Sequence, residues 1–125
     1  MSWPTLKVEL LAVVERLRVV WVERLPWDHL VRLYDSPETF FYLGPPYRVE
    51  SAKAYRHYFT DEDHARLADI LRGLRGKWLL SYNDGRFIRS LYRGVGIKIG
   101  KLSAMYTIQK EDNKRSVKEL LIRNF

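Results

Sequence analysis

Apolar residues near the start of the chain recur at the spacing of an α-helix. The repeating positions are Leu6, Leu10, Val13, Val14 and Leu17. Steps of three and four residues bring these side chains to one side of a helix, so the pattern predicts an amphipathic helix over residues 5–17. Residues 19–22 read Val-Val-Trp-Val. This β-branched and aromatic run predicts a short strand.

The rest of the chain alternates between helical and strand patterns. Helices are predicted to begin at Pro26 and Thr60 and to form around Phe87, and strands are predicted over residues 39–43, 78–82, 95–108 and 119–122. Asp61, Glu62 and Asp63 follow Thr60, as the positive end of a helix dipole favours. The alternation predicts an α/β fold with a sheet that is parallel until a final antiparallel hairpin. A length of 125 residues indicates a single domain, 1–125.

Charge is distributed unevenly along the chain. The net charge is +7, and residues 86–125 alone carry ten Lys or Arg and three Asp or Glu, which accounts for all of it. A one-sided basic surface favours an anionic partner, with nucleic acid ahead of a membrane surface. A merely solvated basic face is the alternative. The candidate DNA-binding residues are Lys98, Lys101, Lys110 and Lys114.

Several classes of site are not expected from the composition. The chain has no cysteine, which excludes disulfides, thiolate metal sites and a cysteine nucleophile. His29, His57 and His64 lack the spacing of paired metal ligands, so no metal site is expected, and His64 is predicted to lie on a helix surface. No apolar run reaches the length of a membrane span and the first residues lack a signal pattern. We therefore expect a cytoplasmic protein with no membrane partner.

The sharpest local feature is the abrupt end of the apolar run 39–43 at Gly44, Pro45, Pro46 and Tyr47. Ligands of open α/β sheets bind outside the carboxyl ends of the strands. Two prolines remove two amide donors and fix the backbone, which leaves a rigid loop with free carbonyls and an aromatic ring behind it. An ordinary Pro-Pro turn followed by a core tyrosine is the alternative interpretation.

Residues 41–47, Phe-Tyr-Leu-Gly-Pro-Pro-Tyr, resemble the catalytic strand and loop of the Dam-like (D12 class) DNA adenine N6-methyltransferases, in which an aromatic strand precedes Asp-Pro-Pro-Tyr. Further segments resemble the same family in the same order. They are residues 15–17, 22–23, 34–37, 55–67, 79–84, 89–92 and 119–124. The resemblance implies a partial Rossmann-like methyltransferase sheet, from a family whose strand order is 3-2-1-4-5-7-6.

The resemblance also implies a chemistry. Enzymes of the family bind S-adenosylmethionine, extrude an adenine from the duplex and methylate its exocyclic amine, because that atom is not reachable inside the stack. In this sequence, the carbonyl of Pro45 would accept a hydrogen bond from the amine. Tyr47 would stack on the extruded ring, and Pro46 would support the shape of the loop.

The sequence departs from the family pattern in three places. The acidic position of the tetrapeptide is Gly44, and losing such an acceptor costs about 10²–10³ in rate. The acidic residue expected near the cofactor aligns with Pro26, for which Asp28 is a poor substitute. The Gly-rich cofactor loop and the target-recognition region would precede residue 1, and residues 94–100 do not replace the loop. The cofactor-binding residues are therefore unknown.

We expect a methyltransferase-like chain, equivalent to the C-terminal half of such an enzyme, that neither binds S-adenosylmethionine nor methylates DNA by itself. Two alternatives stay open: a non-catalytic DNA-binding or protein-interaction module, and one half of a split methyltransferase. Strand 39–43 would form an uncovered sheet edge, which is a template for pairing. A homodimer, or a complex with a complementary methyltransferase half, is therefore also expected.

Overall fold

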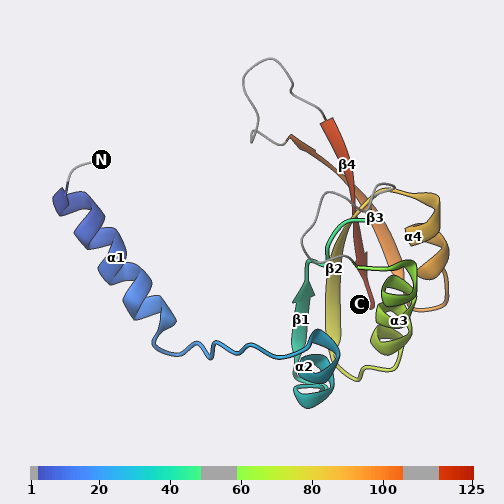
Figure 1. Cartoon of the computed structure of the whole chain (residues 1–125), viewed down its shortest axis with the longest axis horizontal. Coiled ribbons are helices and arrows are strands. Elements are labelled where there is room, and N and C mark those ends of the chain that lie inside the picture. Colours follow the sequence, from blue (N-terminus) through green and yellow to red (C-terminus); the bar gives the residue numbers. More distant parts are fainter. Residues whose placement is uncertain (1–2, 49–58, 106–115) are drawn as a thin grey trace.

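The computed structural model describes residues 3–48, 59–105 and 116–125 (Figure 1). The elements, in chain order, are α1 (Trp3–Leu17), α2 (Trp27–Leu33), β1 (Phe40–Leu43), α3 (Asp61–Arg72), β2 (Lys77–Asn83), α4 (Arg86–Leu91), β3 (Lys98–Met105) and β4 (Ser116–Arg123). Apart from the strand predicted over residues 19–22, helices and strands follow the predicted order, and the α/β fold class is confirmed.

The four strands form one mixed sheet in the order β1-β2-β4-β3. β1 runs parallel to β2, with Phe41 opposite Trp78. β4 lies between β2 and β3 and is antiparallel to both. This order equals the order 4-5-7-6 that the family resemblance implies for these strands. Within the described part of the chain, β1 is an end strand and has β2 as its one neighbour.

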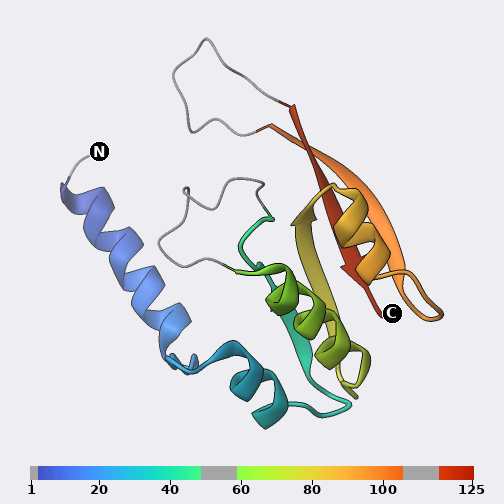
Figure 2. The ribbon, with the colours of Figure 1, turned by 45° about the vertical axis from the view of Figure 1, so that its right-hand side comes forward.

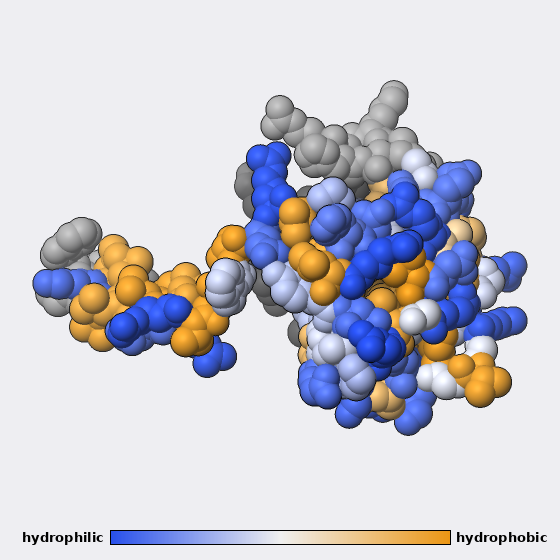
Figure 3. Space-filling model, turned by 90° about the horizontal axis from the view of Figure 1, so that it is seen from below, coloured by the Kyte–Doolittle hydropathy of each residue, from blue (hydrophilic) through white to orange (hydrophobic). Residues whose placement is uncertain are grey.

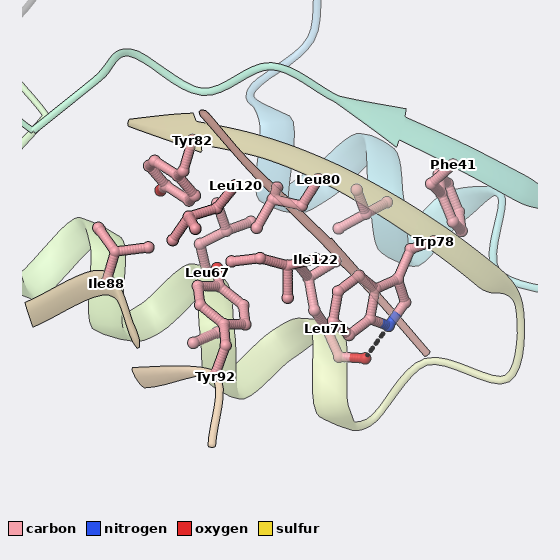
Figure 4. Packing of buried hydrophobic residues seen from close by; sticks show 12 residues of the cluster. Phe41, Leu67, Leu71, Trp78, Leu80, Tyr82, Ile88, Tyr92, Leu120 and Ile122 are labelled. Carbon is pink, nitrogen blue, oxygen red and sulfur yellow. Dashed lines mark hydrogen bonds between the residues drawn. The ribbon is translucent and has the colours of Figure 1, made fainter. Parts of the chain in front are cut away.

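The core lies between one face of the sheet and α3 and α4, which Figure 2 shows in front of the same face. Residues of β2 alternate between this face and the other, so Trp78, Leu80 and Tyr82 are all buried. They pack with Leu67 and Leu71 of α3 (Figure 4). The indole Nε1 of Trp78 donates a hydrogen bond to the carbonyl of Leu71 at 2.9 Å, which satisfies the one polar atom of that side chain.

The predicted start of the helix after Thr60 is confirmed. The hydroxyl of Thr60 accepts a hydrogen bond from the amide of Asp63 at 3.1 Å, and the carboxylate of Asp63 accepts one from the amide of Thr60 at 3.0 Å. This reciprocal pair satisfies two amides that a helix leaves free at its first turn. The same backbone hydrogen bond from Thr60 lowers the pKa of Asp63.

Two strand predictions need correction. Residues 19–22 do not form a strand, because a β-branched run needs a neighbouring strand and this segment has none in the described structure. The strand predicted from residue 95 begins at Lys98, because Gly94 and Gly96 adopt positive φ angles of 152° and 80° in a preceding turn. Residues 106–108 of that prediction lie outside the described residues.

Gly76 lies where two chain segments approach closely at the start of β2. A Cβ atom placed on Gly76 would lie 2.8 Å from the carbonyl oxygen of Thr39 and 2.9 Å from that of Ser36. The amide of Gly76 donates to the carboxylate of Asp35 at 2.9 Å, and a similar hydrogen bond from the amide of Arg75 is the main reason that the pKa of Asp35 is lowered. Only a residue without a side chain fits this crossing.

Candidate functional site

The loop Gly44–Tyr47 emerges from the carboxyl end of β1, where ligands of α/β sheets bind. Leu43 lies opposite Leu80, and the next residue, Gly44, lies beside Ser81. A Cβ atom on Gly44 would be 4.0 Å from the Ser81 hydroxyl, an ordinary contact, and no closer heavy atom surrounds it. The φ angle of Gly44 is not positive. The backbone and the surrounding space at this position therefore accept a larger residue.

A small cavity of about 250 Å³ opens beside this loop. Its walls come from α2, the end of β1, the loop, and the residues before and within α3. The lining residues are Trp27, Leu43, Gly44, Pro45, Pro46, Phe59 and Leu67. The rings of Trp27 and Phe59 meet edge to face, with centroids 6.0 Å apart. A confined apolar space with two aromatic walls suits a flat ring better than a charged group.

Tyr47 does not line this cavity. Its hydroxyl donates a hydrogen bond to the carboxylate of Glu119, which lies on β4 and is almost fully buried. Its half-buried ring packs against the core. The stacking role that the resemblance implies for Tyr47, and the carbonyl-acceptor role of Pro45, stay predictions, because the structure contains no base.

Arg48 fastens the exit of the loop to two other elements. Its guanidinium makes two hydrogen bonds to the carboxylate of Asp61 at the start of α3, at 2.7 and 2.9 Å, and lies 4.7 Å from the ring centre of Phe87. The amide of the Asn83 side chain donates to the Arg48 carbonyl at 3.0 Å. The hydrogen bonds from Arg48 are the main cause of the lowered pKa of Asp61. The loop is thus held at its far end by both α3 and the end of β2.

His64 is buried, so the prediction that it lies on a helix surface is wrong. Its Nδ1 is 2.7 Å from the Tyr82 hydroxyl, and its ring packs on Phe59 with centroids 4.8 Å apart. Burial lowers the pKa of His64 and raises that of Tyr82. The sequence holds a signal for this placement, because positions 64, 67, 68 and 71 share one face of a helix. The spacing of position 64 relative to the other buried positions of α3 thus predicts the burial of His64 better than the polarity of its imidazole does.

The candidate DNA-binding residues are only partly described. Lys98 and Lys101 both lie exposed on β3. Successive side chains of a strand alternate between its two faces, so residues three apart lie on opposite faces. These two lysines therefore do not share a face of the sheet. Lys110 and Lys114 lie outside the described residues.

Two expectations about other classes of site can be compared with the structure. Within residues 3–48, 59–105 and 116–125, no group of three or more His, Asp or Glu side chains is placed to hold a metal ion. In the same residues, no helix has both the length and the apolar composition that crossing a bilayer requires.

Several contacts of the site join segments far apart in the chain, and sequence patterns carry no signal for them. Glu119 as partner of Tyr47, Asp61 as partner of Arg48, and the cavity walls Trp27 and Phe59 are of this kind. Each depends on how β1, α2 and α3 pack. The sequence pattern of the loop is local, whereas the cavity walls beside it depend on the fold.

Comparison with known proteins confirms the family resemblance over most of the chain. No curated protein matches the sequence. A family model does match, over residues 23–108, and it describes the D12 class N6 adenine-specific DNA methyltransferases. The matched region includes β1, the loop after it, the cavity walls and the whole of β3. A match over more than half of the chain identifies the family directly, and the chain belongs to the D12 class N6 adenine-specific DNA methyltransferase family.

Proposed function

We propose that this chain presents the target-base end of a D12-type DNA adenine methyltransferase site, and that Gly44 leaves it deficient in methyl transfer. The observation that supports the proposal is the position of the Gly44–Tyr47 loop. It follows the carboxyl end of β1 inside the region that matches the family, and three of its residues line the apolar cavity. The cavity suits a purine ring, and the loop contributes the carbonyls beside it.

The chemical consequence of Gly44 concerns the exocyclic amine of adenine. As that nitrogen attacks a methyl group it gains positive charge and must lose a proton, so acceptors around it stabilise the transition state. The carbonyl of Pro45 can accept one hydrogen bond there. A carboxylate at position 44 would accept a second hydrogen bond, and its negative charge would stabilise the positive charge that develops on the amine. Its absence lowers the rate by about 10²–10³.

Methyltransferases of this family depend on S-adenosylmethionine. The cofactor carries a sulfonium ion and a charged amino-acid group, both of which require polar or acidic partners when they leave water. The lining of the cavity beside Gly44 contains no charged residue. Asp28, near the position where the family resemblance implies an acidic residue, is paired with Arg66 at 2.6 Å. The described residues therefore do not fit the cofactor, and no step of the reaction is derived through it.

The test separates base binding from methyl transfer. Duplex DNA with 2-aminopurine at a target adenine gains fluorescence when the base leaves the stack. We expect the wild-type chain to produce that gain, and Trp27→Ala, which removes a cavity wall, to weaken it. Trp21→Ala is the matched control, because Trp21 is 89% exposed and lies outside this cavity. No gain with the wild-type chain would contradict base binding.

Methyl transfer is measured with radiolabelled S-adenosylmethionine and a duplex that has adenine, not 2-aminopurine, at the target position. Because the described residues do not fit the cofactor, the cofactor-binding half of a D12-type methyltransferase is added as a second chain. We expect Gly44→Asp to raise the rate by about 10²–10³, because the position has room for the side chain. Gly44→Asn, of nearly equal size but uncharged, is the matched control and should stay near the wild-type rate. Equal rates for the wild-type and Gly44→Asp chains would show that Gly44 does not limit methylation.

A further inference from the structure

The N-terminal arm, defined here as residues 3–22, carries an apolar surface that the described structure leaves uncovered. It consists of α1 and the segment that follows it, and it projects from the body on the side of β1 (Figure 1). Leu10, Val13, Val14 and Leu17, which recur at helical spacing, are each at least half exposed. Figure 3 shows apolar residues along α1 and along the segment that joins it to the body. Helices with such a stripe gain their stability by packing it against another element.

The segment after α1 has the composition of a strand, but no described residue pairs with it. Val19, Trp21 and Val22 are 86%, 89% and 87% exposed. Directly after this segment, Glu23 accepts a hydrogen bond from the Tyr34 hydroxyl at 2.6 Å, which joins the end of the arm to the residue that follows α2. An exposed segment of aromatic and β-branched residues is suited to pairing with the edge of a strand.

The body of the same chain offers a matching surface. Within the described residues β1 has no neighbour on one edge. Its side chains Phe40 and Tyr42 are exposed, while Phe41 is buried. Tyr42, Leu79 and Leu121 share the sheet face opposite α3 and α4, because their strand neighbours Phe41, Leu80 and Ile122 lie in the core. A hollow of about 420 Å³ over β2, β4 and β3 includes Leu79 and Leu121 in its lining.

We propose that the N-terminal arm of one copy docks on the β1 edge and the adjacent open sheet face of a second copy, with residues 19–22 extending the sheet and α1 covering its face. A reciprocal exchange gives a two-fold symmetric dimer in which both surfaces of each chain are covered. The edge is then no longer free to pair with other chains.

The charge of the arm favours a protein occupant over a nucleic acid or a bilayer. Residues 3–22 contain three basic and two acidic side chains, so their net charge is +1. Helices that bind anionic membranes or nucleic acid carry a strongly basic polar side. A second copy also supplies an unpaired strand edge and an open sheet face, and its own arm needs the same cover.

The first test measures molar mass by light scattering across a concentration series of the full chain. We expect a molar mass of twice 14.9 kDa for the wild-type protein. Leu10→Glu, in the apolar stripe, should raise the dimer dissociation constant at least tenfold. Leu11→Glu is the matched control, because Leu11 is as exposed as Leu10 (57% against 53%) but points away from the stripe. A wild-type monomer, aggregates of mixed size, or equal effects of the two variants would overturn the proposal.

The second test identifies which chain the arm covers. Since the sequence has no cysteine, Val20→Cys and Tyr42→Cys introduce the only two thiols. The two single variants are mixed and treated with a short bis-maleimide, and we expect a covalent product that contains one chain of each kind. The double variant in a single chain should cross-link between copies. A product cross-linked within one chain would show that the arm folds back on its own β1 edge, which overturns the exchange.

Discussion

Gly76→Ala tests the crossing of two chain segments that sets β1 beside β2. The added methyl group would lie 2.8 and 2.9 Å from two backbone carbonyl oxygens and 3.3 Å from the ring of Phe41. Backbone atoms cannot rotate away as a flexible side chain can, so the turn before β1 or the start of β2 must move. Overpacking of this kind costs about 1–3 kcal/mol, and contact with two backbone atoms places the loss in the upper half of that range.

The movement also weakens the hydrogen bonds that join the two segments. The amide of Lys77 donates to the Thr39 carbonyl at 2.9 Å, and the amide of Gly76 donates to Asp35 at the same distance. Both would lengthen as the segments separate. The free energy of unfolding therefore falls by more than the steric contribution alone.

Urea unfolding followed by far-ultraviolet circular dichroism measures this loss. With an m-value of about 2 kcal/mol/M, a loss of about 2–3 kcal/mol lowers the midpoint by about 1–1.5 M. Gly73→Ala is the matched control, because its methyl group would lie 3.5 Å from the nearest atom and its φ of −88° suits alanine. That variant should be neutral or more stable by about 0.4–1 kcal/mol. Coincident midpoints for the two variants would refute the steric argument.

Three further predictions concern the core, the end of the sheet and DNA. Burial lowers the pKa of His64 below its ordinary value of 6.5, so as the pH falls the unfolded chain takes up the proton first. The wild-type chain should therefore lose unfolding free energy, measured by urea unfolding, from about pH 7 to pH 5. The His64→Phe variant should lose less over the same range. Parallel pH profiles for the two proteins would contradict a contribution from His64. Asn124→Ala removes two side-chain hydrogen bonds, of 2.8 and 3.0 Å, to the backbone at the start of β2. The free energy of unfolding should fall by about 1–3 kcal/mol. An unchanged urea midpoint would show that these two hydrogen bonds do not stabilise the fold. Duplex DNA binding, measured by fluorescence anisotropy, should weaken steeply between about 50 and 200 mM salt. Lys98→Glu and Lys101→Glu should weaken the binding unequally, because the two lysines lie on opposite faces of the sheet. Binding that is independent of salt, or equal losses for the two variants, would exclude a one-sided basic surface.

The sequence predicts the structure correctly where a feature depends on neighbouring residues alone. The start of α3 after Thr60, the end of β1 before Gly44 and the alternation of helices and strands can each be predicted from neighbouring residues. Residues 19–22 were mispredicted because strand formation depends on a partner, which β propensity does not supply. His64 was misplaced because its polarity was weighed above its position on the buried face of α3. The cavity walls Trp27 and Phe59 lie on segments that only packing brings together.

The position of β4 constrains how the chain folds during synthesis. Of the four described strands β4 is made after the other three, yet it lies in the interior of the sheet, between β2 and β3. Until Arg123 has left the ribosome, neither of these strands has this neighbour, and Leu120 and Ile122 are missing from the core. A ribosome that adds about 5–20 residues per second leaves the apolar side of β2 incomplete for several seconds. Folding of this sheet is therefore expected to wait for β4, and nascent chains that stop short of β4 become substrates for chaperones or proteases.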